Sequence, residues 1–439
     1  MSRLELGFWS FAVLLALVFL RAPIGLAMLL CGFGGWYFAM NGNPTPLLAK
    51  LKSETYTTFS SYSLSIIPLF LLMGQFATLS GMSTSLFKAA ESFLGHRRGG
   101  VAMAAVGACA GFGAICGSSL ATAATMSKVA LPELKRYGYS GGFSTATLAA
   151  GGTLGILIPP SVILVIYAII TEQNIAKLFL AAFIPGILAA IGYMLTISLY
   201  VRLYPASAGT RPRAPMSERL QALGATWPVL VIFAVVVGGI YLGWFTPTEG
   251  AAVGAAGTGL VALLSGSLNW KVFKESLVGT ARTTAMIFFI VLGASFYNGF
   301  LALSGVPQFM ADTVLGQGYN PWLVLSVILA FYLIFGCLMD SLSMILLTVP
   351  IFFPVISAMD FGLTPEQVAI WFGILVLIVV EVGLITPPVG MNLFIINAMD
   401  KKTPMTETYK AVLFFVGSDI VRVVLLVAFP AITLFLIPS

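Results

Sequence analysis

The sequence predicts an all-α, polytopic membrane protein built from two inverted repeats, each with five membrane crossings and one re-entrant helical hairpin. Of the 439 residues, 59% are hydrophobic and only 9% are charged, whereas about a quarter of a soluble domain is charged. Apolar runs of roughly 18 residues or more recur along the whole chain, and such runs span a bilayer as helices. Landmarks of the first half return in the second half at nearly constant spacing, which indicates a duplication.

Ten crossings are expected in chain order. Those of the first half lie near residues 5–20, 23–41, 62–80, 141–171 and 175–204. Those of the second half lie near 226–245, 248–268, 281–303, 365–399 and 407–436. The crossings at 141–171 and 365–399 each contain a Pro-Pro pair, so we expect both to be broken helices.

Two further apolar stretches, 99–133 and 321–359, are too long for one crossing and break near the middle. We expect each to form a helical hairpin that enters and leaves the membrane on the same side. The segments 82–98 and 269–279 have the pattern of amphipathic helices that lie in the membrane interface. The repeats are therefore expected at 1–204 and 226–439, joined by a linker, 205–225, that is rich in proline and arginine.

Basic residues predict the orientation of these crossings. With the N-terminus outside, 17 of the 22 lysines and arginines fall on the inner side and 4 on the outer side, and Arg422 lies within the last crossing. This asymmetry is what the positive-inside rule expects. Both termini are therefore predicted to be external and the linker cytoplasmic. The net charge of +6 thus reflects membrane orientation, and we expect no nucleic-acid partner.

The internal repeat rests on four matches in the same order. The Pro-Pro pairs at 159–160 and 387–388 are 228 residues apart, and LSG at 79–81 returns at 303–305. Pro23 matches Pro247 at an offset of 224, and Ser119 matches Ser341 at an offset of 222. Each half has an odd number of crossings, so the second copy is inverted and the hairpins open from opposite sides, as in many secondary transporters.

The prolines Pro159, Pro160, Pro387 and Pro388 mark the two helix breaks. A break within the membrane frees backbone groups that lipid cannot satisfy, so such backbone must be buried in protein or line a polar cavity. Freed carbonyls can coordinate a hard cation, whereas half-helix N-termini suit an anionic substrate group. The sequence therefore predicts an ion and substrate site where the breaks and the hairpin tips meet.

Oxygen-bearing and small residues surround the breaks and the hairpin tips. Hydroxyl, carboxylate and carbonyl oxygens suit an oxygen-seeking ion, for which we favour Na⁺. The candidate sodium-binding residues are Gly117, Ser118, Ser119, Thr153, Gly155, Asp340, Ser341, Gly383 and Thr386. The alternative is that these glycines and serines only let helices pack closely, with proline as a kink.

Three residues are candidates for contact with substrate: Ser161, Asn392 and Arg282. Arg282 begins a crossing at the cytoplasmic edge and most simply extends its charge to the interface, so a carboxylate-binding role is the minor alternative. The four cysteines lie in apolar segments without metal-ligand spacing, and His96 is the single histidine. We therefore expect no transition-metal site and no catalytic triad.

Charged residues within crossings are rare and usually functional. Asp340 lies at a predicted hairpin tip, so we expect a functional role. Asp419 and Arg422 are three residues apart on the last helix and are expected to neutralise each other as a structural pair. The sequence leaves the roles of Glu249 and Glu381 open.

The motifs together resemble the large membrane (M) subunit of tripartite ATP-independent periplasmic (TRAP) transporters, along the full chain. The resemblance rests on GGTLGILIPPS at 151–161, GLITPPVGMN at 383–392, the GSS hairpin tip, MDSLS and the paired LSG. It implies a Na⁺-driven importer of organic acids, such as C4-dicarboxylates or sialic acid, in a bacterial inner membrane, where the external termini predicted from the basic residues would be periplasmic. It also implies an elevator-type ion-transporter architecture, with a Na⁺ site between each hairpin tip and the neighbouring broken helix.

The resemblance further implies two partners and no cofactor other than the coupling ion. A periplasmic substrate-binding protein would deliver the carboxylate substrate to the membrane subunits. Some family members fuse the small membrane subunit to the large one. No four-helix extension precedes residue 5, so we expect the small subunit to be a separate chain.

Other functions remain open at this point. The nearest alternative is a stand-alone divalent-anion/Na⁺ symporter that works without a binding protein. A membrane-embedded enzyme would need a convergent acid/base or metal constellation, for which one histidine and scattered carboxylates are poor material. A passive channel is the third alternative, although paired broken helices with hairpins favour alternating access.

Overall fold

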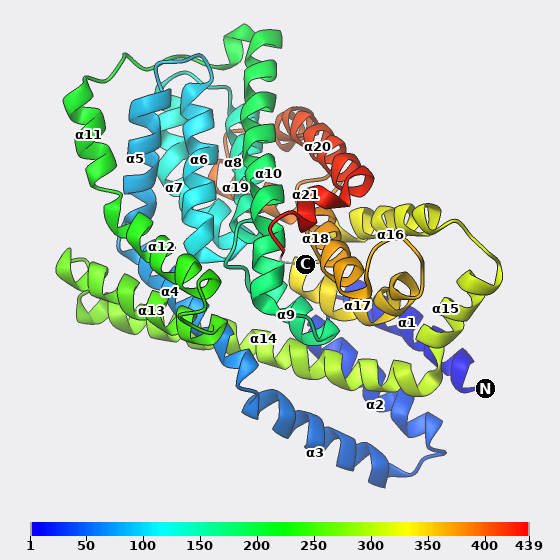
Figure 1. Ribbon diagram of the computed structural model, residues 1–439. Helices are drawn as coiled ribbons and strands as arrows, with labels where there is room; N and C mark the ends of the chain where they lie inside the picture. Colours follow the sequence, from blue (N-terminus) through cyan, green and yellow to red (C-terminus); the bar gives the residue numbers. More distant parts are fainter. Residues whose placement is uncertain (1, 438–439) are drawn as a thin grey trace.

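The computed structural model describes residues 2–437, which form helices joined by short turns (Figure 1). The ends of the two predicted repeats, residues 1 and 438–439, lie outside the described residues. The helices of the first half are α1 (Arg3–Phe19), α2 (Ile24–Ala39), α3 (Pro44–Ser60), α4 (Ile66–Leu79), α5 (Met82–Leu94), α6 (Gly100–Cys116), α7 (Ser119–Arg136), α8 (Gly141–Leu157), α9 (Val162–Thr171) and α10 (Ile175–Leu203). Those that follow are α11 (Met216–Gly224), α12 (Trp227–Tyr241), α13 (Pro247–Leu264), α14 (Trp270–Ser304), α15 (Val306–Gly316), α16 (Pro321–Gly336), α17 (Ser341–Ser357), α18 (Pro365–Gly383), α19 (Met391–Met399), α20 (Met405–Ala428) and α21 (Pro430–Leu434).

Several helices are long and apolar enough to cross a membrane. In the described chain, α10, α14, α18 and α20 qualify alone, and three bent pairs of helices raise the number to as many as seven. The apolar helices α2, α6, α16 and α17 are shorter. The protein is therefore an all-helical integral membrane protein, and the number of ten crossings stays a prediction.

The predicted hairpins and breaks coincide with pairs of helices. Segment 99–133 forms α6 and α7, and segment 321–359 forms α16 and α17. Segment 141–171 forms α8 and α9, which bend by 45° at the break. Segment 365–399 forms α18 and α19. The two halves contain these elements in the same order, whereas the inversion of the second half stays a prediction.

One pair of matching segments differs between the halves. In the first half, α3 and the following 3₁₀ turn and α4 (Ser63–Leu79) meet at a bend of 53°. In the second half, α14 runs through the matching region as one helix of 35 residues. The linker, 205–225, is also less irregular than expected, because it contains a 3₁₀ turn (Pro205–Ser207) and the whole of α11.

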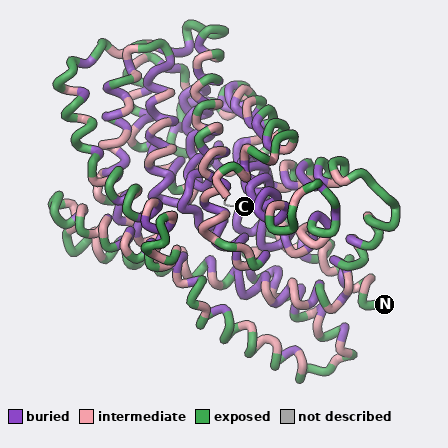
Figure 2. Tube along the Cα trace, viewed as in Figure 1, coloured by how far each residue is buried: buried purple, intermediate pink, exposed green. Residues whose placement is uncertain are grey.

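The core of the molecule is formed by α8 and α18. Every residue of α8 from Gly142 to Leu157 is buried, and so is every residue of α18 from Val368 to Gly383. The hairpin helices α6 and α7 pack on α8, and α16 and α17 pack on α18. Figure 2 shows this buried centre surrounded by helices with exposed outer faces. Those faces carry apolar side chains such as Trp9, Leu195 and Leu264, as expected of surfaces in contact with lipid.

Candidate functional site

Both Pro-Pro pairs interrupt the chain where the sequence predicts. α8 ends at Leu157, and α9 begins after Ser161, whose hydroxyl accepts a hydrogen bond of 3.4 Å from the Leu164 amide. α18 ends at Gly383, and α19 begins after Gly390, which has a positive φ of 66°. The Pro159–Pro160 and Pro387–Pro388 peptide bonds are both cis. The prediction of two breaks is confirmed.

Both hairpin tips are capped so that a serine begins the second arm. Gly117, with φ 62°, ends α6, and the Ser118 side chain caps α7. Asp340 caps α17, because its carboxylate accepts hydrogen bonds from the Ser343 amide (3.1 Å) and hydroxyl (2.5 Å). Asp340 at its tip thus fixes a helix start, a role that polar caps commonly have.

The two hairpin tips meet at one carboxylate. The Ser119 hydroxyl donates to one oxygen of Glu381, and the Ser341 hydroxyl donates to the other at 2.6 Å. Glu381 lies in α18 and is fully buried. Residues that are 222 positions apart in the sequence therefore bind the same side chain, and α18 links the two hairpins.

Glycines allow each hairpin to approach a broken helix closely. A Cβ atom on Gly383 of α18 would lie 2.6 Å from the carbonyl carbon of Gly336 in α16. In the first half, a Cβ on Gly113 of α6 would collide with the backbone of Gly155 in α8. Backbone therefore packs on backbone beside both breaks, and the sodium-binding role of Gly155 and Gly383 stays a prediction.

A cavity of about 140 Å³ lies between the hairpin tips and α14. It brings together Gly117, Ser118, Ser119, Asp340 and Ser341, all of which are predicted sodium-binding residues. Its lining is Leu71, Gly117, Ser118, Ser119, Leu120, Ile156, Val162, Ile163, Thr283, Met286, Ile287, Asp340, Ser341, Leu342 and Leu384.

The other candidate residues lie around this cavity but do not line it. Thr386, in the turn after α18, donates to the Val382 carbonyl near the end of that helix at 2.6 Å. Asn392 is buried and donates at 3.3 Å to the carbonyl of Ala149 in α8, so it ties the two broken helices together. Arg282 is exposed on α14, whereas its neighbour Thr283 lines the cavity.

Thr153 belongs to a buried network that leads away from the cavity. Its hydroxyl lies 3.0 Å from the Tyr193 hydroxyl, which donates to Asp419 at 2.8 Å. Asp419 forms an ion pair of 2.7 Å with Arg422. The predicted structural pair in the last helix is therefore confirmed, and it also holds α8, α10 and α20 together. Glu249, which the sequence left open, completes a capping box with Thr246 at the start of α13.

The chemistry around the tips fits an oxygen-seeking cation. The hydroxyl of Thr122 and the side-chain oxygen of Asn392 are buried near the breaks and have no hydrogen-bond partner among residues 2–437. At the tips themselves, the two serine hydroxyls and the Glu381 carboxylate provide hard oxygen atoms and a negative charge, which is the ligand type that alkali and alkaline-earth cations prefer.

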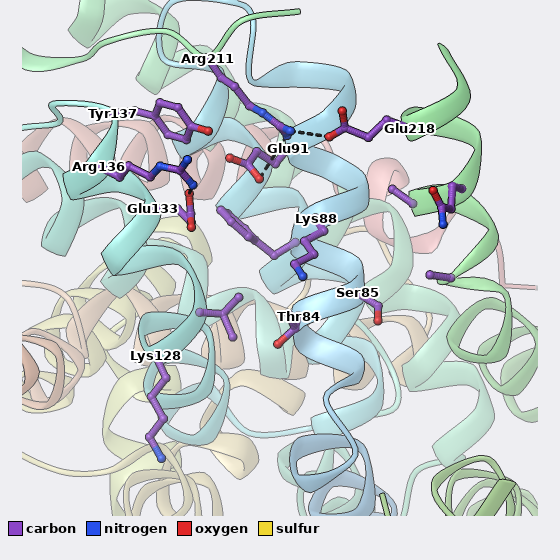
Figure 3. A pocket seen from close by; sticks show the side chains of 15 residues that line it. Thr84, Ser85, Lys88, Glu91, Lys128, Glu133, Arg136, Tyr137, Arg211 and Glu218 are labelled. Atoms are coloured by element: carbon purple, nitrogen blue, oxygen red, sulfur yellow. Dashed lines mark hydrogen bonds and ion pairs between the residues drawn. The ribbon is translucent and has the colours of Figure 1, made fainter. Parts of the chain in front are cut away.

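A second, larger cavity of about 810 Å³ lies beside the linker (Figure 3). α5, α7 and α11 line it with charged side chains, among them Lys88, Glu91, Glu133 and Arg136. Arg211 of the linker forms ion pairs with Glu91 (3.4 Å) and Glu218 (2.5 Å). Burial raises the pKa of the Glu91 carboxyl above its ordinary value, against the opposing charge of Arg211. These contacts fasten the linker to α5.

Sequence reasoning left the central residue, Glu381, without a role. A signal for it was present: at the offset of 228 that joins the Pro-Pro pairs, Glu381 and Gly383 match Thr153 and Gly155. Glu381 thus occupies a predicted ion-site position of the repeat. Thr283 could not be found in this way, because its contact with the cavity depends on how α14 packs.

Comparison with known proteins gives consistent matches along the chain. The family described as "Tripartite ATP-independent periplasmic transporter, DctM component" matches residues 11–432. The chain is 37% identical to the C4-dicarboxylate TRAP transporter large permease protein DctM of Pseudomonas aeruginosa, over 88% of each chain. It is 30% identical to the sialic acid TRAP transporter large permease protein SiaM of Vibrio cholerae, over 96% of each.

One solved structure has a similar fold. The YdaH transporter of Alcanivorax borkumensis matches with a TM-score of 0.64 at 15% identity, and the match covers 88% of this chain and 89% of that one. At this identity the likeness concerns the fold alone.

Proposed function

Because the chain belongs to the DctM component family of tripartite ATP-independent periplasmic transporters, we propose that it is a Na⁺-coupled secondary active importer of an organic acid. Membership makes it a TRAP transporter large permease and places it in a membrane. Coupling to Na⁺, the substrate and the partners are the proposal. The observation that carries it is the convergence of both hairpin-tip serines on the buried Glu381 carboxylate.

A cation site at the tips is supported by the charge of Glu381. An ionised carboxylate within a membrane is costly unless a cation or several donors compensate it. Na⁺ bound beside Ser119 and Ser341 would supply that compensation, and Gly117, Ser118 and Asp340 offer further oxygen atoms at the same cavity. Asp340 and Glu381 together give the region enough negative charge for more than one cation.

The substrate is proposed to be a carboxylate. Relatives are named for C4-dicarboxylates and for sialic acid, both of which are organic acids. Val162 and Ile163 at the start of α9 line the cavity, so the N-terminus of α9, which Ser161 caps, faces the space between the tips. Helix N-termini favour anions through their free amides and dipole.

We propose an elevator cycle in which the hairpins and broken helices move together past α14. A periplasmic binding protein would deliver the substrate, and a separate small membrane subunit would complete the transporter. The chain would lie in the bacterial inner membrane with both termini in the periplasm. The apolar outer faces of α1, α2 and α14 leave room for a membrane partner.

The test is uptake into proteoliposomes that contain the chain and its small subunit, with binding protein and radiolabelled C4-dicarboxylate or sialic acid outside. An inward Na⁺ gradient should drive uptake, and an equal K⁺ gradient should not. Ser119→Ala and Ser341→Ala should each raise the Na⁺ concentration for half-maximal uptake about tenfold, equivalent to the loss of one ligand interaction of about 1.4 kcal/mol.

Ser418→Ala is the matched control, because Ser418 is a partly buried serine of α20 outside the cavity between the tips. Equal uptake with K⁺, or an unchanged Na⁺ response in both tip variants, contradicts the proposal. Uptake without any binding protein would favour a stand-alone symporter instead.

A further inference from the structure

Glu381 has an unusual environment. Its side chain is fully buried, and its hydrogen-bond donors among the described residues are the hydroxyls of Ser119 and Ser341. In that part of the chain, no lysine or arginine forms an ion pair with it. Two neutral hydroxyls leave most of the charge of a carboxylate uncompensated.

The two donors to Glu381 occupy matching positions of the two predicted repeats. The position that matches Glu381 in the first repeat carries no charge. Ser119 and Ser341 each begin the second arm of a hairpin, and their offset of 222 is close to that of the repeat. The residue that matches Glu381 in the first half is Thr153, which bonds to Tyr193 instead. One carboxylate therefore serves two hairpin tips.

The N-termini of α7 and α17 both point at this carboxylate, because Ser119 and Ser341 are their first residues. A hydroxyl that donates its hydrogen to Glu381 keeps its lone pairs free to face a cation on the other side. At each tip, one serine oxygen and one Glu381 oxygen can thus coordinate a cation together with nearby oxygen atoms.

We propose that Glu381 is the shared counter-charge of two cation sites, one at each hairpin tip, and that it couples their occupancy. This inference rests on the proposed Na⁺-coupled function and assigns the coupling to one residue. A cation bound at either tip orients and neutralises the same carboxylate. The affinity of the other tip for a cation therefore changes. Two sites that share a group in this way have a coupling free energy.

The first measurement is the unfolding temperature of the purified full chain in increasing NaCl, with choline chloride keeping the ionic strength constant. Because a ligand of the folded state stabilises it by mass action, the concentration midpoint reports Na⁺ binding. Glu381→Gln should raise this midpoint at least about tenfold. Without Na⁺, the same variant should unfold at the same or a higher temperature than the parent, because the uncompensated charge is gone. A merely structural anchor would instead lose stability without Na⁺.

The second measurement is a double-mutant cycle of Ser119→Ala and Ser341→Ala. With Glu381 in place, each serine variant changes the NaCl midpoint by some factor. The factor for the double variant should differ from the product of the two single factors by about fivefold or more, which is the lower range of typical couplings. In the Glu381→Gln background, the factor for the double variant should equal the product of the two single factors. Glu381→Asp keeps the charge but is too short to reach both serines, so it should keep a Na⁺ response and lose the coupling.

The outcomes separate the two proposals. If the parent shows no Na⁺-specific stabilisation, the proposed function and this inference both fail. If the parent responds and Glu381→Gln responds alike, or if the serine effects are independent in the parent, only the shared counter-charge is overturned. Loss of stability of Glu381→Gln without Na⁺ also overturns it.

Discussion

At the level of single residues, Gly383 allows α18 and α16 to touch backbone to backbone. Gly383→Ala would place a Cβ 2.6 Å from the carbonyl carbon of Gly336, and this contact has no flexible side chain that could move away. We expect a loss of about 1–3 kcal/mol of stability, measured as a lower unfolding temperature in detergent. Gly417→Ala on α20 is the control, because a Cβ there has no neighbour within 4 Å. Equal stability of both variants would contradict the packing argument.

Asp400 provides a prediction about pH outside the membrane crossings. It is buried and accepts hydrogen bonds from Lys135 (2.7 Å) and Thr403 (2.7 Å). Burial alone would raise the pKa of this carboxyl, but the bonds and the charge of Lys135 outweigh it and hold the pKa below its ordinary value of 3.8. The ionised form is therefore favoured by folding, and this stability is present above pH 3.8 and is lost as pH falls further.

Asp400→Asn should consequently lower the unfolding temperature at pH 7, by a free energy of about 1 kcal/mol for a partly exposed pair. The difference from the parent should shrink as the pH falls below 3.8 and the carboxylate of the folded parent becomes protonated in turn. Thermal unfolding at pH 7 and in steps below pH 4 checks this. A difference that does not depend on pH would show that the charge is irrelevant.

The sequence singled out many residues that line the cavity between the hairpin tips, but not how they meet. Gly117, Ser118, Ser119, Asp340 and Ser341 were identifiable, because turn-forming and hydroxyl residues stand out in apolar segments, and the structure gathers them at one cavity. Their shared contact with Glu381 was not predictable, since it joins residues 262 and 40 positions away. Such long-range contacts depend on packing and not on local pattern.

At the level of elements, the linker and α11 are fastened to α5 by Arg211. Besides its two ion pairs, its backbone amide donates to the Gly95 carbonyl at 2.9 Å. Arg211→Ala should leave the buried Glu91 without its cation, at a cost of about 1–2 kcal/mol once partial exposure is discounted. Limited proteolysis should then cut the segment 205–225 faster.

The cleavage rate of Arg211→Ala should fall on acidification. The pKa of Glu91 is already raised by burial, so it protonates readily when the guanidinium is removed, and the uncompensated charge disappears. Arg213→Ala is the control, because Arg213 is an exposed arginine of the same segment. Equal cleavage of both variants would mean that the ion pairs do not hold the linker.

Hydrophobic periodicity and proline positions predicted most elements, including the helix pairs α6–α7 and α16–α17 and both breaks. They did not predict that α3 and α4 are separated by a bend while α14 is continuous. The bend lies in the polar stretch SSYSLS at 60–65, in which no proline marks a break. Serine hydroxyls can bond to nearby backbone and compete with helix continuation, but the outcome depends on neighbouring helices.

At the level of the whole molecule, an elevator cycle requires the hairpin tips to change position along α14. Leu120 at the first tip and Met286 of α14 line the same cavity. Leu120→Cys combined with Met286→Cys should be cross-linked by Hg²⁺, which should stop uptake while Na⁺-dependent stabilisation remains. The four natural cysteines are buried, so they should contribute little background. Leu120→Cys with Ser295→Cys is the matched pair that should not cross-link in this state, and full uptake after cross-linking would contradict the cycle.

Positions along the continuous helix α14 can be converted into depths in the membrane. Its 35 residues correspond to about 52 Å, more than the roughly 30 Å of bilayer hydrocarbon. We expect the charged residues Lys271, Lys274 and Arg282 to hold the first part of α14 at the headgroups, which leaves the 22 residues 283–304 to cross about 33 Å.

Measured along α14 from this expected boundary, the hairpin tips do not lie at the middle of the bilayer. They adjoin Thr283, Met286 and Ile287, within about 6 Å, measured along the helix, of the boundary expected at Arg282. A separate cavity of about 390 Å³ adjoins Ser295 and Asn298, farther along α14. With α14 placed in this way, the cavity at the hairpin tips lies near the membrane boundary at the Arg282 end of the helix. The proposed elevator cycle would then have to move the tips about 12 Å along α14 to reach the level of Ser295.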